Sequence, residues 1–170
     1  DGSQITMLKA LELSDSDHHA LLDASKKLNI EFMSTPFDVR SVDFLVHEIG
    51  VQRLKIGSGE LTNALLLMKM AHTCIPVILS TGMASISEIE AALGVLAFGY
   101  LARNNAPPSI KGFASAFLDS QGKALLKKYV TLLHCTSDYP AAPSTINLRA
   151  MDHLESVFGL PVGLSDHSQG

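Results

Sequence analysis

Several features that mark particular protein classes are missing from this chain of 170 residues. Tryptophan is absent and aromatic residues make up only 6%, so aliphatic side chains must fill most of the core. No apolar run approaches the roughly 18 residues that a membrane-spanning helix needs. The chain does not open on a basic segment followed by an apolar one, so no signal peptide is visible. These absences predict a cytoplasmic protein without a membrane span.

The excess of one sign of charge over the other is also small. Lys and Arg number 13 against 17 Asp and Glu, which gives a net charge of −4 at pH 7. Nucleic-acid-binding domains normally carry a basic surface, so nucleic acid is not an expected partner. The two cysteines, Cys74 and Cys135, lack the spacing of metal ligands and are interpreted as free thiols in a reducing compartment.

The chain alternates between two kinds of segment. Short aliphatic runs with polar ends are followed by amphipathic stretches that carry helix-start signals. The predicted strands cover residues 30–34, 53–57, 77–80, 130–135 and 160–165. Strict alternation of strand and helix predicts an α/β fold with a parallel sheet and right-handed crossovers.

Capping residues predict where the helices begin and end. The expected N-caps are Ser14, Asp38, Thr62, Ser85 and either Ser144 or Thr145. Ser14 and Ser85 are each followed three residues later by an acidic residue, which is the pattern of a capping box. Gly50 and Gly159 stand where helices are expected to end. The connection over residues 100–128 is longer than the others and is predicted to be an insertion, with an extra helix within residues 115–128.

Two architectures fit this alternation: an open doubly wound sheet and part of a (β/α)8 barrel. Lys55 and His134 lie inside apolar strands, where a charge is costly if helices cover both faces of the sheet. At the top of a barrel such side chains face the mouth of the active site. No GxGxxG or GxxxxGK[ST] loop follows any strand, which weakens the nucleotide-binding alternative. We therefore expect a barrel, and an incomplete one, because a full barrel takes about 250 residues.

Every predicted strand ends in polar residues, and in a barrel these ends converge on one face. A lysine with serine hydroxyls beside helix N-termini suits a phosphate group. A histidine suits a metal ion or a proton transfer. Most Ser and Thr residues at such positions simply cap the next helix. Lys55 is interpreted as functional, because burying a charged side chain in a strand costs free energy and a functional role would explain it.

Five motifs at these strand ends, in this order, resemble the sialic acid synthase family, which includes N-acetylneuraminate synthase and its legionaminate and pseudaminate relatives. The motifs are STPFD at 34–38, KIGSGE at 55–60, LSTGM at 79–83, HCTSDYP at 134–140 and GLSDH at 163–167. The resemblance implies that residues 1–170 hold about strands 3 to 7 of a TIM barrel, with the insertion between strands 5 and 6. Strands 1, 2 and 8 and a C-terminal antifreeze-like domain are expected to be absent.

The resemblance also implies a reaction. Members of the family condense phosphoenolpyruvate with an N-acyl hexosamine, such as N-acetylmannosamine, to give a nonulosonic (sialic) acid and phosphate. A divalent metal, Mn²⁺ first and Mg²⁺ second, is expected to assist. The full-length chain is expected to be a homodimer, and the 170-residue segment alone is expected to be inactive.

The roles of individual residues follow from the same resemblance. Glu60 and His167 match catalytic positions, and His167 also matches a metal ligand. The residues that match substrate-binding positions are Thr35, Lys55, Ser58, Ser80, Ser137, Tyr139 and Ser165. Ser137 stands where some members have Asn, while His134 and Asp166 have no assigned role.

Two other functions stay open at this point. The first is a Schiff-base aldolase in which Lys55 is the nucleophile, and a borohydride-trapped adduct would identify it. The second is a barrel module that binds a sugar or a phosphate without turnover.

Overall fold

A four-stranded parallel sheet forms the centre of the computed structural model, which describes residues 4–101 and 106–169. The strands are β1 (Leu54–Ile56), β2 (Val77–Ser80), β3 (Val130–His134) and β4 (Val162–Leu164). Their order in space is β1-β2-β3-β4, so each strand lies beside the next strand of the sequence. A doubly wound sheet reverses its order at a switch point, whereas a barrel does not. The predicted α/β fold with a parallel sheet is confirmed, and the strand order favours the barrel type.

The helices alternate with these strands. Before β1 lie α1 (Gln4–Leu11), α2 (Asp15–Lys27), α3 (Val39–Asp43) and the π-helix η1 (Phe44–Ile49). Between β1 and β2 lie the 3₁₀ turn η2 (Ser58–Glu60) and α4 (Ala64–His72). Between β2 and β3 lie α5 (Ile86–Tyr100), α6 (Ile110–Leu118) and α7 (Ser120–Tyr129). The 3₁₀ turn η3 (Pro143–Thr145) and α8 (Arg149–Phe158) precede β4. Within the described ranges, no helix combines the length and the apolar character that crossing a membrane requires.

Most of the predicted helix ends are confirmed. Ser14 and Ser85 form the two capping boxes, and the Asp38 carboxylate accepts a hydrogen bond from the Ser41 backbone N–H at 2.8 Å. Gly50 and Gly159 end their helices with φ angles of 74° and 63°. Glycine adopts this left-handed backbone without the steric cost of a side chain.

The strand predicted at residues 30–34 is wrong. The structure shows an extended segment that has no strand partner among the described residues. Ile30 is 60% exposed and Met33 is 41% exposed, so this segment lacks the two-sided cover that stabilises a parallel strand. An ion pair between Arg53 and Glu31, 2.7 Å long, connects it to the residues before β1.

Two predicted N-caps are also wrong. The turn η2 continues to Leu61, which moves the start of α4 from Thr62 to Asn63. The Asn63 side chain accepts a hydrogen bond from the Leu66 N–H at 3.2 Å. Neither Ser144 nor Thr145 caps α8, because both lie in η3, and α8 begins at Arg149.

The long crossover from β2 to β3 holds more helix than the sequence predicts. The helix expected within residues 115–128 is two helices, α6 and α7. The helix is interrupted at Asp119, whose side chain accepts hydrogen bonds from the backbone N–H groups of Gln121 and Gly122 and so caps α7. The helix α1 was not predicted, and residues 102–105 of the proposed insertion lie outside the described residues.

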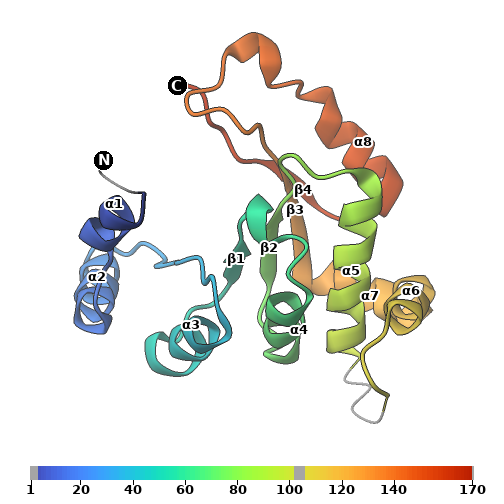
Figure 1. Cartoon of the computed structure of the whole chain (residues 1–170), viewed down its shortest axis with the longest axis horizontal. Coiled ribbons are helices and arrows are strands. Elements are labelled where there is room, and N and C mark those ends of the chain that lie inside the picture. Colours follow the sequence, from blue (N-terminus) through green and yellow to red (C-terminus); the bar gives the residue numbers. More distant parts are fainter. Residues whose placement is uncertain (1–3, 102–105, 170) are drawn as a thin grey trace.

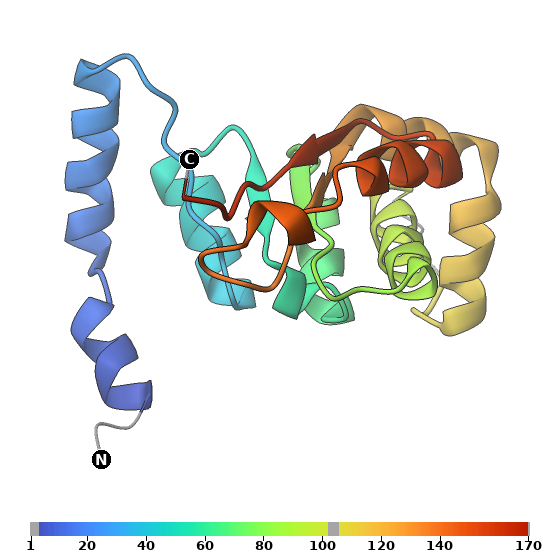
Figure 2. The same cartoon turned by 90° about the horizontal axis from the view of Figure 1, so that it is seen from above.

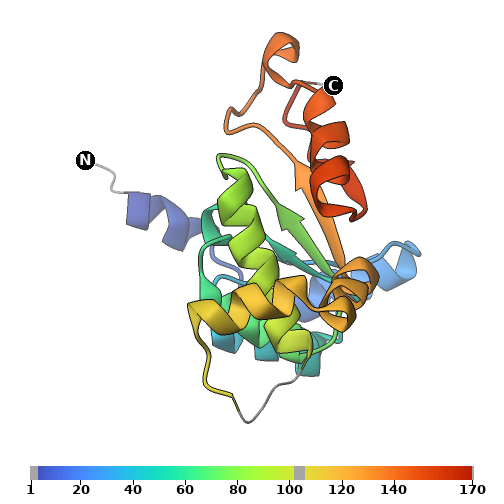
Figure 3. The ribbon, with the colours of Figure 1, turned by 90° about the vertical axis from the view of Figure 1, so that its right-hand side faces the viewer.

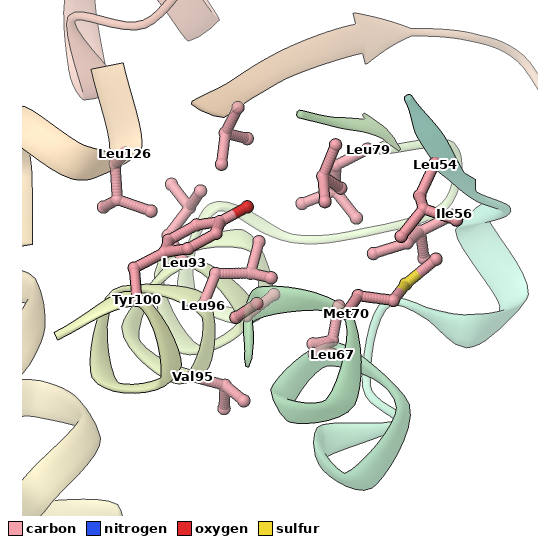
Figure 4. Packing of buried hydrophobic residues seen from close by; sticks show 14 of the residues in the cluster. Leu54, Ile56, Leu67, Met70, Leu79, Leu93, Val95, Leu96, Tyr100 and Leu126 are labelled. Carbon is pink, nitrogen blue, oxygen red and sulfur yellow. The ribbon is translucent and has the colours of Figure 1, made fainter. Parts of the chain in front are cut away.

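The hydrophobic core lies on one face of the sheet, where α4 and α5 pack (Figure 4). Side chains alternate between the two faces of a strand, and those facing these helices are completely or almost completely buried. They are Leu54, Ile56, Val77, Leu79, Val130 and Leu132. The opposite face carries Lys55, Ile78, Thr131 and Leu133, which are half-buried. One face of the sheet is therefore closed by helices and the other is open.

The helices α1 and α2 stand apart from the sheet (Figures 1 and 2). No described side chain of α2 is fully buried, and the ring of His18 meets that of Phe44 edge-on at 5.5 Å. Figure 3 shows the strand arrows pointing to the side from which residues 135–148 project. The carboxyl ends of the strands and this projecting loop therefore share one side of the molecule.

Candidate functional site

The end of β1 presents a cation and a carboxylate. Lys55 lies on the open face of the sheet, in register with Ile78 of β2. Among the described residues Lys55 has no ion-pair partner within 4.0 Å, so its ammonium group is available to an anionic ligand. Glu60 lies in η2, and its carboxylate accepts a hydrogen bond from the Asn63 side-chain amide at 2.7 Å. Asn63 therefore caps α4 and also orients Glu60.

The end of β2 buries hydroxyl groups. Ser80 is only 3% exposed, and its Oγ finds no hydrogen-bond partner among the described residues. Thr81 donates both its backbone N–H and its hydroxyl to the Leu133 carbonyl, each at 3.0 Å. A buried hydroxyl without a partner is costly, which makes Ser80 Oγ a candidate contact for a ligand.

Three strand ends meet at Gly82. The Gly82 N–H donates to the Cys135 Sγ at 3.1 Å, which joins the loop after β2 to the residue after β3. A Cβ atom at position 82 would lie 2.8 Å from that sulfur and 3.4 Å from the Ser58 Oγ. Ser58 of η2, which follows β1, therefore lies beside the same glycine.

A second group lies at the ends of β3 and β4. The His167 Nε2 lies 2.9 Å from the Tyr139 hydroxyl and 3.2 Å from the Ser165 Oγ. The Tyr139 and His167 rings stack, with their centroids 3.9 Å apart. The remaining ring nitrogen, His167 Nδ1, is buried and has no hydrogen-bond partner among the described residues. Three predicted site residues thus form one contact group.

His134 connects this group to the sheet. Its Nε2 donates a hydrogen bond to the Ile146 carbonyl across the projecting loop. Its backbone carbonyl accepts a hydrogen bond from the Ser165 N–H at 2.8 Å. The Ala141 N–H donates to the His167 carbonyl, also at 2.8 Å, so the loop that carries Tyr139 is fixed at more than one point.

Asp166 has a local partner. Its carboxylate accepts a hydrogen bond from the Ser168 backbone N–H at 2.9 Å. That hydrogen bond is the main reason why the pKa of Asp166 lies below its ordinary value. Asp166 thus organises the turn after β4.

Two predicted site residues lie apart from these groups. Thr35 lines a hollow of about 750 Å³ between the start of α2 and α3, together with Ser14 and Asp38. No other predicted site residue is among the described residues that line this hollow. Ser137 is exposed on the projecting loop.

A complete metal centre is not formed by the described residues. Within residues 4–101 and 106–169, no three His, Cys, Asp or Glu side chains gather in a way that could hold a metal ion. His167 offers one buried and unpartnered nitrogen, which suits a single ligand to a metal. The fit to a metal is therefore limited to this one atom of the described chain.

Sequence reasoning missed the contacts of Cys135, Gly82 and His134. The sequence indicates only that Cys135 is a small buried residue. The packing of two loops shows that its sulfur accepts a hydrogen bond from a backbone N–H. His134 carried a signal, because a polar ring at the end of an apolar strand requires a partner. The identity of that partner, the Ile146 carbonyl, depends on the path of the loop.

Comparison with known proteins identifies the family. A family model described as the NeuB family matches residues 1–170. The chain belongs to the NeuB family. The resemblance to sialic acid synthases that the five motifs carry is confirmed.

Several NeuB relatives share much of this sequence. An N,N'-diacetyllegionaminic acid synthase of Legionella pneumophila is 44% identical over 168 residues, which cover 99% of this chain and 41% of that protein. A Campylobacter jejuni protein of the same name is 43% identical, over 100% of this chain and 43% of its own length. The crystal structure of an N-acetylneuraminic acid (sialic acid) synthetase from Leptospira borgpetersenii in complex with citrate matches with a TM-score of 0.74 and 36% identity. It covers 95% of this chain and 47% of the solved chain, so this chain spans less than half the length of each relative.

Proposed function

We propose that the full-length protein condenses phosphoenolpyruvate with an N-acyl hexosamine to give a nonulosonic acid and phosphate. The observation that carries this proposal is the 44% identity, over 99% of the chain, to an N,N'-diacetyllegionaminic acid synthase. The name of that relative favours a hexosamine with two N-acetyl groups as the first substrate to test, with N-acetylmannosamine as the second.

The four strands are proposed to be part of a TIM barrel in the full-length protein. Their consecutive order and their parallel direction support this. In that arrangement β1 to β4 take the places of strands 4 to 7, and the extended residues 30–34 lie in the place of strand 3. The helices α6 and α7 form the insertion that precedes strand 6.

Lys55, Ser58 and Ser80 are proposed to bind the phosphate of phosphoenolpyruvate. Lys55 supplies the positive charge, and it has no ion pair within the described residues that would compete. Ser80 supplies a hydroxyl that is already buried without a partner, so a phosphate oxygen would relieve its desolvation. Thr35 is proposed as a more distant hydroxyl contact, because its hollow is separate in this structure.

Tyr139, Ser165 and Ser137 are proposed to face the sugar. Tyr139 is 77% exposed on the projecting loop, and its hydroxyl is oriented by His167. Glu60 is proposed as the acid–base group near the reacting carbon, held by the Asn63 amide.

The proposed chemistry forms one carbon–carbon bond and replaces the carbon–oxygen bond to phosphate with one to an oxygen atom from water. The C3 carbon of phosphoenolpyruvate attacks the aldehyde carbon of the open-chain sugar, whose oxygen takes up a proton. Water then adds to the oxocarbenium carbon that this attack creates and releases one proton. The new hydroxyl loses its second proton and becomes the ketone oxygen as phosphate departs with the bridging oxygen. A cation and hydroxyl groups near the phosphate stabilise the charge on the leaving group.

A divalent metal, Mn²⁺ before Mg²⁺, is proposed as the cofactor. The buried and unpartnered Nδ1 of His167 supports a role for that residue as one ligand. When bound, the metal would supply a Lewis acid to the aldehyde oxygen. The other ligands are proposed to come from parts of the protein beyond the described residues.

The test is phosphate release from phosphoenolpyruvate by the full-length protein, with each sugar and with or without Mn²⁺. Lys55→Ala should lower kcat/KM by about 100-fold, because one hydrogen bond to a charged group is worth about 1.5–3 kcal/mol. Lys111→Ala, which removes an exposed lysine of α6, is the matched control and should leave turnover unchanged. His167→Ala should abolish the phosphate release that Mn²⁺ stimulates, whereas His72→Ala, which changes an exposed histidine, should not.

Other outcomes would point elsewhere. A borohydride-stable adduct on Lys55 would favour the Schiff-base aldolase over the synthase. Binding of phosphoenolpyruvate without release of phosphate, whichever hexosamine is added, would favour the non-catalytic module. Turnover by residues 1–170 alone would refute the expectation that this segment is inactive.

Two proposals concern the setting of the enzyme. Cys74 and Cys135 are both unpaired, which supports the cytoplasm as its compartment, because thiols persist in a reducing environment. The full-length protein is proposed to be a homodimer, and light scattering of the purified protein tests this directly.

A further inference from the structure

Cys135 holds an unusual position for a buried cysteine. It is 8% exposed, yet it does not belong to the main hydrophobic cluster of described residues between the sheet and the helices. Its sulfur instead contacts the backbone of the loop after β2, through the Gly82 N–H at 3.1 Å. General core packing therefore does not account for this side chain.

The space around Gly82 is set by that sulfur. A Cβ at position 82 would lie 2.8 Å from the Cys135 Sγ, which is closer than real contacts allow. The same point lies only 3.4 Å from the Ser58 Oγ, so the thiol and the serine approach the glycine together. The Cys135 sulfur also accepts the hydrogen bond of the Gly82 N–H, which satisfies the backbone donor of a buried residue.

The surroundings connect this contact to ligand binding. The Ser80 Oγ, two residues before Gly82, is buried without a partner. The Thr136 Oγ1, one residue after Cys135, is likewise buried without a partner among the described residues. Two hydroxyls that lack partners thus lie within two residues of the thiol contact in the sequence, one in each of the two segments that it joins.

We infer that Cys135 is a positioning residue, whose thiol sets the distance between the Gly82 loop and Ser58 and thereby shapes the phosphate site. This inference rests on the proposed function for the identity of the phosphate as that of phosphoenolpyruvate. The thiol takes no part in bond making. Without the sulfur, the Gly82 N–H loses its acceptor and the loop is free to shift relative to Ser58.

The experiment compares Cys135→Ala, Cys135→Ser and Cys74→Ala in the full-length protein. Cys135→Ala should raise KM for phosphoenolpyruvate by about 5- to 10-fold, the equivalent of one lost hydrogen bond, with kcat and the KM of the sugar nearly unchanged. Cys135→Ser keeps an acceptor and should recover most of this loss. Cys74 is exposed, so Cys74→Ala is the matched control and should behave like the wild type.

A double substitution tests the geometry itself. Gly82→Ala alone should raise KM for phosphoenolpyruvate more than Cys135→Ala does, because the new methyl group collides with the sulfur. In Gly82→Ala/Cys135→Ala the sulfur is gone, so KM should fall below that of Gly82→Ala. Additive effects in this cycle would overturn the inference. A Cys135→Ala protein in which the KM values of both substrates rise equally and the melting temperature falls would also overturn it, since those changes indicate a structural role.

Binding of inorganic phosphate, measured by calorimetry, separates this inference from the proposed function. If the wild type releases no phosphate with any hexosamine, the proposed function fails. Weaker phosphate binding by Cys135→Ala than by Cys74→Ala would still support the positioning role. Equal affinities, or no binding by the wild type, would refute that role.

Discussion

On the helix-covered face of the sheet Leu54, Leu79 and Leu132 are completely buried in apolar contacts, whereas several of the buried atoms at the strand ends are polar. Ser80 Oγ, Thr136 Oγ1 and His167 Nδ1 have no hydrogen-bond partner among the described residues. The first region gains stability from packing that is complete without a ligand. The second keeps unsatisfied groups that a ligand can engage, which costs stability in its absence. Fold and function thus place opposite demands on the strands and on the residues at and just beyond their carboxyl ends.

The largest expected effect contrasts the two faces of β2. Leu79→Ala removes a fully buried side chain and should lower the free energy of unfolding by about 2–5 kcal/mol. Ile78→Ala changes the next residue, on the open face, and in the 170-residue chain it should cost clearly less because Ile78 is only half-buried there. Urea unfolding of both variants measures the difference, and equal losses would contradict the description of one closed and one open face.

His134→Phe tests whether hydrogen bonds hold the strand-end region. The change leaves the part-buried Ile146 carbonyl without its donor, and the loss of a typical hydrogen bond costs about 0.5–1.5 kcal/mol. KM for the sugar should rise more than KM for phosphoenolpyruvate, because the affected loop carries Tyr139. His153→Phe changes an exposed histidine of α8 and is the control. The same KM values in both variants would show that this contact does not position the loop.

Ser80→Ala should separate stability from binding. Removal of a buried hydroxyl that has no partner should leave stability unchanged or raise it by up to about 1 kcal/mol. Affinity for phosphoenolpyruvate should fall by about 5-fold, since one neutral hydrogen bond is lost. Melting temperature and KM are the two measurements, with the exposed Ser115→Ala of α6 as control. A large loss of stability would indicate that Ser80 is structural.

The smallest effect concerns pH and the helix caps. The backbone N–H and then the hydroxyl of Ser41 lower the pKa of Asp38, and Ser85 lowers the pKa of Glu88 in the same way. A carboxyl group with a lowered pKa in the folded state stabilises the protein at neutral pH. This contribution is lost as the pH falls below about 4, where the carboxyl groups become protonated.

Asp38→Asn keeps a capping side chain that does not titrate. The melting temperature of the wild type should therefore fall more steeply than that of Asp38→Asn when the pH is lowered from 5 to below the ordinary carboxyl pKa of about 4. If acidification lowers the melting temperature of the wild type and of Asp38→Asn by the same amount, that result would contradict a titrating cap at this helix.

The sequence predicted the sheet where local signals agree. Residues 77–80 combine an aliphatic run with a polar end, and capping at Ser85 follows at once, so strand and helix were both recognised. Residues 30–34 have the same aliphatic character, but a strand also needs a hydrogen-bonded neighbour, which no local pattern encodes. Likewise, Asn63 rather than Thr62 caps α4, because the preceding 3₁₀ turn decides where the helix begins.

For the site, the sequence predicted residues rather than contacts. Lys55 and Ser80 were recognisable because they interrupt or end apolar strands. The stacking of Tyr139 on His167 was not, because 27 residues separate them and η3, α8 and β4 determine how they return to each other. The Gly82–Cys135 contact is similarly a property of two loops that only the sheet brings together.

The consecutive order of the strands has a consequence for synthesis of the protein. A ribosome releases the chain from its N-terminus, so β1 and α4 emerge before β2, and β2 emerges before β3. Each strand after β1 finds its partner already made, and no strand has to be inserted between two others. Assembly can therefore proceed in one direction along the chain, with every added strand extending an edge that its predecessor has just provided.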